Sequence, residues 1–159
     1  MMQIIKRRIG LMAAVLLGSM SLINAQGLDS AVVRQKVEGK NYTFVAQSAN
    51  PMRGRVIQLT SLYDLRISGD SVIAALPYYG RAYSAPVNPS DNGINFTAVA
   101  SEYKSVYRKK RWEITIRPKE VANVNEMNLI IYPNGRATLQ VNSNIRQPIS
   151  FYGYLAEKK

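Results

Sequence analysis

The sequence contains no cysteine and no histidine. Without cysteine there can be no disulfide, no thiol nucleophile and no metal site with sulfur ligands. Without histidine, Ser-His-Asp and Cys-His catalysis are excluded, and so are zinc or iron sites with imidazole ligands. The fold must therefore be held by burial of apolar side chains, and the two commonest kinds of catalytic centre are absent.

Acidic residues are also scarce, with 10 Asp and Glu against 21 Lys and Arg. A glycosidase needs two carboxyl groups that converge on one bond, and nothing in the spacing singles out such a pair. There is no calcium-loop pattern, phosphate-binding glycine motif or nucleophile elbow. We therefore expect no enzyme activity and no cofactor.

The excess of basic residues gives a formal net charge of +11. Such a charge favours anionic partners, namely phospholipid or lipopolysaccharide headgroups, acidic glycans or nucleic acid. An exported location makes nucleic acid the least expected of these, so no nucleic-acid partner is predicted. The alternative is that the charge serves only solubility.

Residues 1–25 have the pattern of an export signal. Lys6, Arg7 and Arg8 precede the apolar run 9–23, and Ala25 provides a small residue at the cleavage position. The run is shorter than the ~20 residues of a membrane span, although a retained anchor is the alternative. No cysteine is available for a lipid anchor. The sequence predicts a periplasmic protein with a single domain over residues 26–159.

Residues 28–38 are predicted to form the one short helix. Asp29 or Ser30 can cap its N-terminus, Val33 and Val37 form a narrow apolar face, and Gly39 is expected to take the left-handed conformation after its end. From residue 41 the apolar period becomes two, which is typical of strands. The expected strands are 41–49, 61–68, 71–76, 94–100, two within 103–118, two within 127–141, and 148–156.

Turn residues separate these strands. Gly69-Asp70 is expected to form a two-residue turn, and Asn134-Gly135 a type I′ turn with positive φ at both positions. The composition of 86–93 indicates a loop, and Pro118 ends a strand. About eight strands with short local connections predict an all-β, antiparallel up-and-down barrel with one N-terminal helix. A β-sandwich is the alternative.

Four sequence blocks resemble a known family. They are "LPYYGRAYSAP", "WEITI", "NGRATLQV" and "RQPISFYGYL", in this order and spacing. The chain resembles the domain-of-unknown-function family 4251 of exported Bacteroidetes proteins over most of residues 30–155. The resemblance implies a lipocalin-like β-barrel in a Gram-negative bacterium. It implies no activity and no functional residue.

The segment 75–86 is the first candidate site. Pro77 and Gly80 are expected to constrain the chain, with Gly80 free to take a positive φ, so that Tyr78, Tyr79, Arg81 and Tyr83 project from a fixed turn. These side chains could bind a sugar, an acyl chain or a carboxylate at a barrel mouth. In the structural alternative, which we favour, the tyrosines pack and their hydroxyls bind loop carbonyls.

The cationic run Arg108, Lys109, Lys110 and Arg111 is the second candidate site. Such a hairpin tip would attract anionic headgroups. The alternative is a solvated tip whose charges discourage pairing between strand edges. Trp112 is expected in the core, because it is in phase with Ile114 and Ile116.

Two functions are therefore expected. The first is a periplasmic barrel that binds a small amphipathic or anionic molecule. The second is an interaction module of the cell envelope that docks on a protein or on an anionic membrane surface through its basic tip. A cavity inside the barrel would favour the first.

Overall fold

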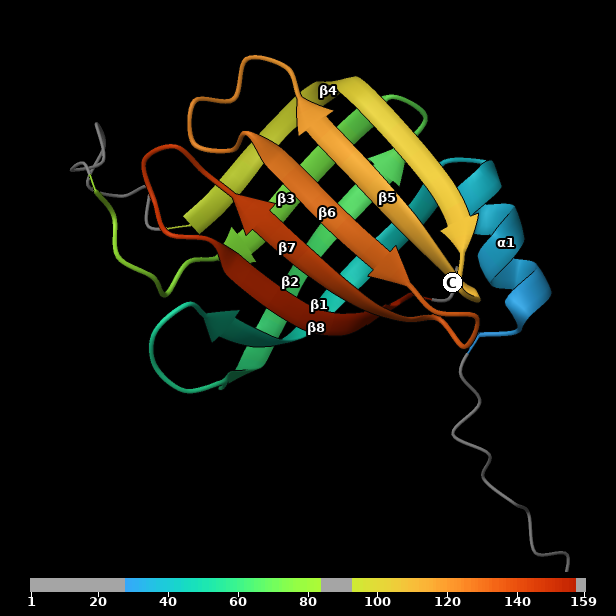
Figure 1. Cartoon of the computed structure of the whole chain (residues 1–159), viewed down its shortest axis with the longest axis horizontal. Helices are drawn as coiled ribbons and strands as arrows, with labels where there is room; N and C mark the ends of the chain where they lie inside the picture. The colour runs from blue at the N-terminus through green and yellow to red at the C-terminus, as the bar shows by residue number, and fades with distance from the viewer. Residues whose placement is uncertain (1–27, 84–92, 157–159) are drawn as a thin grey trace, which may run out of the picture.

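The computed structural model describes residues 28–83 and 93–156, which form a closed antiparallel barrel of eight strands (Figure 1). Neighbouring strands are consecutive in sequence, and β8 returns to pair with β1. The elements are α1 (Ser30–Glu38), β1 (Asn41–Pro51), β2 (Ile57–Ser68), β3 (Ser71–Pro77), β4 (Gly93–Arg108), β5 (Arg111–Pro118), β6 (Glu126–Ile131), β7 (Arg136–Asn142) and β8 (Ile149–Leu155). The predicted up-and-down barrel is confirmed, and the sandwich alternative is wrong. The predicted signal segment 1–25 and nearly all of the predicted loop 86–93 lie outside the described residues.

Helix α1 lies at the end of the barrel where β1 begins and β8 ends (Figure 1). Asp29 caps it, because its Oδ1 accepts a hydrogen bond of 3.0 Å from the backbone N–H of Ala31. Val33 and Val37 are buried against the core, as their spacing predicts. The helix thereby covers this end of the barrel with its apolar face.

The expected left-handed conformation at Gly39 is wrong. Gly39 has φ −78° and continues the helical hydrogen bonding, its N–H donating to the carbonyl of Gln35 at 2.9 Å. Lys40 takes the left-handed conformation instead, with φ 46°. The chain reverses one residue later because Gly39 still completes the last helical turn.

The barrel interior is filled by large apolar side chains. Twelve of them are less than 2% exposed: Phe44, Phe151, Leu65, Ile67, Leu76, Ile114, Ile116, Met127, Leu129, Ile131, Leu139 and Ile149. A side chain that lined a cavity large enough for water would expose area to it. Among the described residues, the interior is therefore a packed core.

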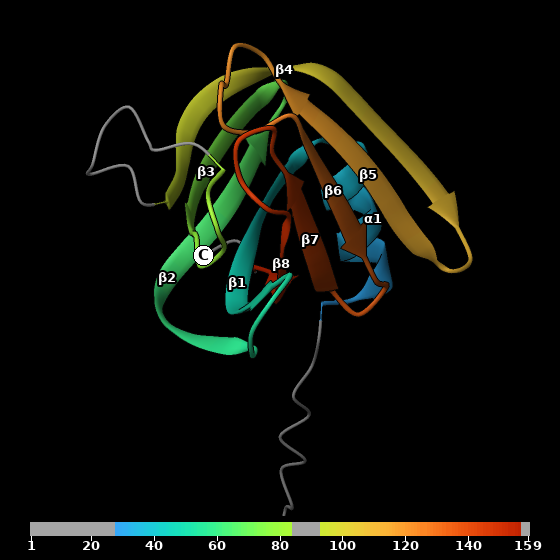
Figure 2. The ribbon, with the colours of Figure 1, turned by 60° about the vertical axis from the view of Figure 1, so that its left-hand side comes forward.

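Strand β4 is one long strand, although two separate strands were predicted over its length. Gly93–Val99 pair with β3, whereas the residues from Ala100 to Arg108 pair with β5. The register shifts between Ala100 and Glu102. This bulge changes the phase of the apolar alternation, which is why the sequence pattern resembled two strands. Beyond it, β4 follows β5, which still pairs with β6 from Trp112 to Ile116, and the tip of the β4–β5 hairpin extends past this pairing (Figure 2).

The hairpin turns differ from prediction in one case. The turn after β2 is confirmed, with Gly69 at φ 59° between the paired Ser68 and Ser71. At the turn after β6, however, only Gly135 has a positive φ, of 79°. The Tyr132 N–H donates a hydrogen bond of 2.8 Å to the carbonyl of Arg136, which closes a three-residue loop. The predicted type I′ turn is wrong because Pro133 enters the loop and fixes a negative φ.

Candidate functional site

The first predicted site lies at the end of β3 and is fixed to the β7–β8 loop. The Tyr78 hydroxyl lies 2.8 Å from the carbonyl oxygen of Arg81 and 3.0 Å from that of Gln147. The Gln147 N–H donates to the carbonyl of Arg81 at 3.0 Å, and the Tyr83 N–H to that of Ile145 at 2.7 Å. The segment 78–83 is thus part of a hydrogen-bonded rim.

Arg146 stabilises this rim from the inside. Its guanidinium carbon lies 5.0 Å from the centre of the Tyr78 ring, and its Nη1 donates to the carbonyl of Gly93 at 2.7 Å. Burial raises the pKa of the Tyr78 hydroxyl. The expected positive φ at Gly80 is wrong. Instead, a Cβ there would lie 2.4 Å from the Tyr78 oxygen, so Gly80 allows the ring to approach.

The four residues predicted at this rim, Tyr78, Tyr79, Arg81 and Tyr83, fall into two groups that differ in exposure and hydrogen bonding. Tyr78 is committed to loop carbonyls, which is the packing role that the sequence analysis favoured. Tyr79, Arg81 and Tyr83 are exposed, the two tyrosines by 42% and 65%. Three side chains therefore remain available to solvent on a fixed backbone.

The second predicted site is the tip of the β4–β5 hairpin. Lys109 and Lys110 form its two-residue turn, and both are left-handed, with φ 51° and 58°. Arg108 and Arg111 flank the turn, and both pair with Glu113, the latter at 2.8 Å. The hydrogen bond from Arg111 lowers the pKa of Glu113. The two arginines therefore share one carboxylate, and the two lysines have no ion pair among the described residues.

The outer face of the hairpin has few acidic groups to offset these lysines. Between Glu102 and Arg117 the sequence has six cations and two carboxylates. Arg117 forms ion pairs with both Glu102, at 2.6 Å, and Glu126, at 2.9 Å. Among the described residues, no carboxylate lies within ion-pair distance of Lys104, Lys109 or Lys110. The tip thus presents uncompensated ammonium groups.

The inner face of the hairpin is aromatic. Tyr107 and Trp112 pair across the strands with ring centroids 4.8 Å apart and an interplanar angle of 53°. Trp112 packs against the core, as its phase predicts, whereas Tyr107 is 54% exposed. This pair braces the point at which the hairpin leaves the barrel.

The two predicted sites lie at opposite ends of the barrel (Figure 1). The rim follows the end of β3, whereas the cationic tip follows the far end of β4. They cannot bind one small molecule together.

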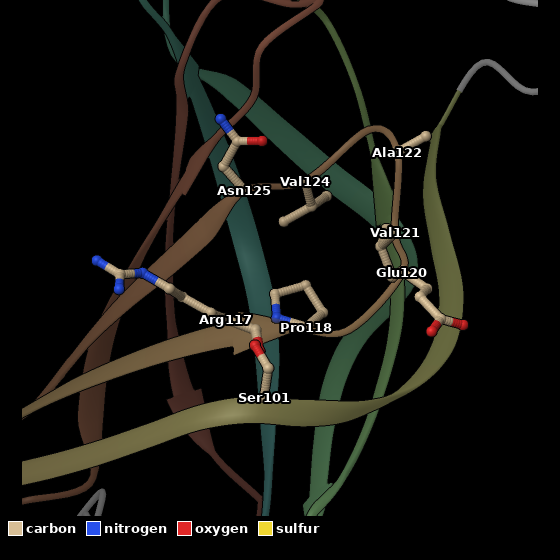
Figure 3. A pocket seen from close by; sticks show the side chains of 8 residues that line it. All are labelled: Ser101, Arg117, Pro118, Glu120, Val121, Ala122, Val124 and Asn125. Carbon is tan, nitrogen blue, oxygen red and sulfur yellow. The ribbon is translucent and has the colours of Figure 1, made fainter.

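A third feature, which the sequence analysis missed, is the loop 119–125 between β5 and β6. It has an open groove on each side, one of about 650 Å³ and one of about 690 Å³. In the first groove, Val124 and Pro118 face each other while Asn125 and Arg117 point outward (Figure 3). No motif marks this loop, because the grooves arise only where the loop crosses the bend of β4.

Residues 28–83 and 93–156 contain neither a metal cluster nor a membrane-spanning helix. No group of three or more acidic side chains there could hold a metal ion. No helix in that part of the chain is long and apolar enough to span a membrane.

Comparison with known proteins gives a family. The model described as "Domain of unknown function (DUF4251)" matches residues 25–155. The chain belongs to the DUF4251 family. The resemblance inferred from the four sequence blocks is therefore confirmed, and the family description assigns no function. Among curated proteins, none matches this chain.

A solved structure of a DUF4251 family protein from Bacteroides eggerthii has the same fold. It is 13% identical, the match covers 82% of this chain and 89% of that one, and the TM-score is 0.57. At this identity the similarity supports the barrel and carries no site residue across.

Proposed function

We propose that this DUF4251 protein is an exported interaction module of the cell envelope that docks on an acidic protein through the β4–β5 hairpin. Export is supported by the signal pattern of residues 1–25. The role is one of binding, without catalysis. The partner is expected to be acidic because the exposed lysines of the hairpin have no carboxylate beside them in the described residues.

The observation that carries this proposal is the conformation of Lys109 and Lys110. A left-handed φ costs a residue with a Cβ roughly 1–2 kcal/mol, and Asn-Gly fits such a turn better. Two lysines nevertheless occupy it, at the far end of a projecting hairpin. Charge at this point is thus present at some cost in stability, which supports a binding role.

Two further observations favour a protein partner. Among residues 28–83 and 93–156, large side chains with almost no exposed area fill the barrel interior, which argues against a small molecule bound there. The tip itself carries four cations, and the only large apolar side chains beside it among the described residues are Val106 and Tyr107 on β4 and the half-buried Trp112, which is a small apolar surface for entry into a lipid layer. Vesicle binding is therefore an alternative outcome of the test.

A small anionic or amphipathic ligand at the rim is the second candidate. It is supported by the exposure of Tyr79, Arg81 and Tyr83 on a backbone fixed by the contacts of Tyr78. Native mass spectrometry of protein taken from its own cells should then show a bound small molecule, which is lost when Arg81 is replaced by alanine. An empty protein in both cases would remove this candidate.

Charge reversal tests the docking role. Lys109→Glu with Lys110→Glu should abolish binding to a polyglutamate peptide at low salt, and wild-type binding should weaken as salt rises. The matched control is Arg53→Glu with Arg55→Glu, an equal charge change in the exposed β1–β2 loop. If both double variants lose binding equally, net charge alone is responsible and the proposal fails. Binding only to vesicles containing phosphatidylglycerol would also overturn it.

A further inference from the structure

Beyond Ala100, strand β4 pairs on one side only within the part of the chain that the structure describes. Its pairing with β3 ends at Val99, and from there to Arg108 the described residues pair it with β5 alone. Figure 2 shows this part of the hairpin standing clear of the other strands. A closed barrel normally removes strand edges, so this free edge is an exception within the fold.

The turn geometry shows which backbone groups the edge presents. Because Lys109 and Lys110 form a two-residue turn with left-handed φ, Arg108 and Arg111 form a hydrogen-bonded pair. Hydrogen-bonded and non-hydrogen-bonded pairs alternate along an antiparallel ladder. The backbone N–H and C=O of Ser105 and Tyr107 therefore point away from β5, toward the free side.

The side chains beside this edge differ on its two faces. Lys104 and Arg108 flank Val106 on the outer face, whereas Tyr107 and Ser105 lie on the inner face with Trp112. All of these β4 side chains are exposed, Val106 by 41% and Tyr107 by 54%. An added strand would place its outer side chains beside cations and its inner side chains beside an aromatic ring.

This charge pattern selects the occupant. If a second copy of the chain paired with this edge in antiparallel fashion, centred on Val106, Lys104 of one copy would lie opposite Arg108 of the other. Like charges in this position repel. An acidic segment would gain an ion pair with Lys104, which has no carboxylate beside it in the described residues, and would lie beside Arg108, which already shares Glu113 with Arg111. The edge is therefore protected against self-association and open to an acidic strand.

We propose that the β4 edge at Ser105–Tyr107 accepts, by antiparallel strand addition, an extended partner segment in which acidic and apolar residues alternate. This inference rests on the docking function proposed above and specifies the class of partner and its mode of binding. Hydrogen bonds from the edge supply affinity, and the alternation supplies register. The residues of the segment that lie opposite Ser105 and Tyr107 form hydrogen-bonded pairs with them, so their N–H groups point toward β4. These residues lie on the inner face of the hairpin and are therefore the apolar ones.

The test uses a synthetic peptide of alternating Glu and Val with the purified protein, and the signal is the fluorescence of Trp112, the single tryptophan of the chain. N-methylation of the valines removes the N–H groups that face β4 and should abolish binding. N-methylation of the glutamates, whose N–H groups face solvent, should leave it unchanged. Equal binding of both methylated peptides would overturn strand addition.

Two substitutions test the same edge from the side of the protein. Ser105→Pro removes an N–H that β5 does not use, so the hairpin keeps its ladder, and peptide affinity should fall about three- to tenfold. Ser105→Ala keeps the N–H and should bind as wild type, and matching unfolding transitions would show that both variants are folded. Equal affinity of the proline and alanine variants would contradict the inference.

The lysine variants separate the two proposals. If Lys109→Glu with Lys110→Glu abolishes peptide binding while N-methylation and Ser105→Pro have no effect, electrostatic docking stands and strand addition fails. If the charge reversal has no effect either, the docking function itself fails. Sedimentation should find the protein monomeric without peptide, and a dimer lost on Ser105→Pro would mean that a second copy occupies the edge instead.

Discussion

Gly153 shows how a single residue allows the barrel to close. It pairs with Ala46 of β1 and with Ala137 of β7, beside the register shift between Ala46 and Ser48. A Cβ at Gly153 would lie 1.9 Å from the carbonyl oxygen of Val45, which is backbone and cannot rotate away. Only glycine fits this closing seam.

Gly153→Ala should therefore lower the free energy of unfolding by about 3 kcal/mol or more, since the seam must separate to admit a methyl group. Urea unfolding measures the change. The control is Gly69→Ala, where no atom lies within 4 Å of the added carbon and only the positive φ opposes it. That substitution should cost about 1 kcal/mol. Equal costs for the two would show that the seam can yield.

Tyr42 and Tyr103 form a second residue-scale feature, a partly buried pair of hydroxyls 2.9 Å apart, with Lys40 over the Tyr103 ring. Burial raises the pKa of Tyr42 well above its usual value of 10.0, and burial also raises that of Tyr103. Both rings connect the first residues of β1 to the bent half of β4.

The raised pKa values predict a loss of stability in alkali. Below pH 10 both hydroxyls are protonated in the folded and unfolded chain, so their contribution is complete. Above pH 10 the unfolded chain releases protons that the folded chain retains, and the free energy of unfolding falls as pH rises through the folded pKa values. Tyr42→Phe should make this fall shallower in urea titrations at several pH values. An unchanged slope would mean that Tyr42 already ionises in the folded protein.

At the scale of elements, the β4–β5 hairpin combines local strain with the proposed docking role. Its sequence predicted a basic tip, but the left-handed turn and the role of Glu113 in pairing two arginines were not predictable. Lysine is not typical of a left-handed turn. Arg108 lies five residues from Glu113 in the sequence, and its side chain reaches the Glu113 carboxylate only once the pairing register of β4 and β5 is set. Physically, the register comes from the inward phase of Trp112, Ile114 and Ile116.

Replacing the turn by Lys109→Asn with Lys110→Gly should stabilise the protein by about 1 kcal/mol, because these residues accept left-handed φ more readily. The same variant should lose binding to the acidic peptide. Thermal unfolding and Trp112 fluorescence measure the two effects. A variant that is stabilised yet binds unchanged would show that the lysines are not contacts.

At the scale of the whole molecule, the barrel is stabilised by a continuous core of buried apolar side chains. Leu129, Leu139 and Phe151 are paired across β6, β7 and β8 and are fully buried. Helix α1 continues this core with Val33 and Val37 at one end. The packing of every strand against the others makes unfolding of the barrel cooperative.

Leu139→Ala should cost about 2–5 kcal/mol, because it removes a buried side chain and leaves a cavity between rigid strands. Leu62→Ala is the matched control, since Leu62 is 74% exposed on β2 and its loss should change the free energy of unfolding by less than about 0.5 kcal/mol. Urea unfolding of both variants checks the difference. A small effect at Leu139 would mean that the interior is looser than its burial indicates.

The sequence by itself determined the strand faces, the helix, the absence of cysteine and histidine chemistry, and the family. The strand faces and the helix follow from local rules, because the period-two alternation of apolar residues and the capping residues act within a few positions. The excluded chemistry follows from composition, and the family follows from the four sequence blocks. Tertiary structure alone decided that the interior is filled, that β4 bends and exposes an edge, that Arg146 holds Tyr78 at the rim, and that the two predicted sites lie at opposite ends. Each of these depends on which distant strands meet and in what register, and pairing across the barrel is not encoded in any single stretch of the chain.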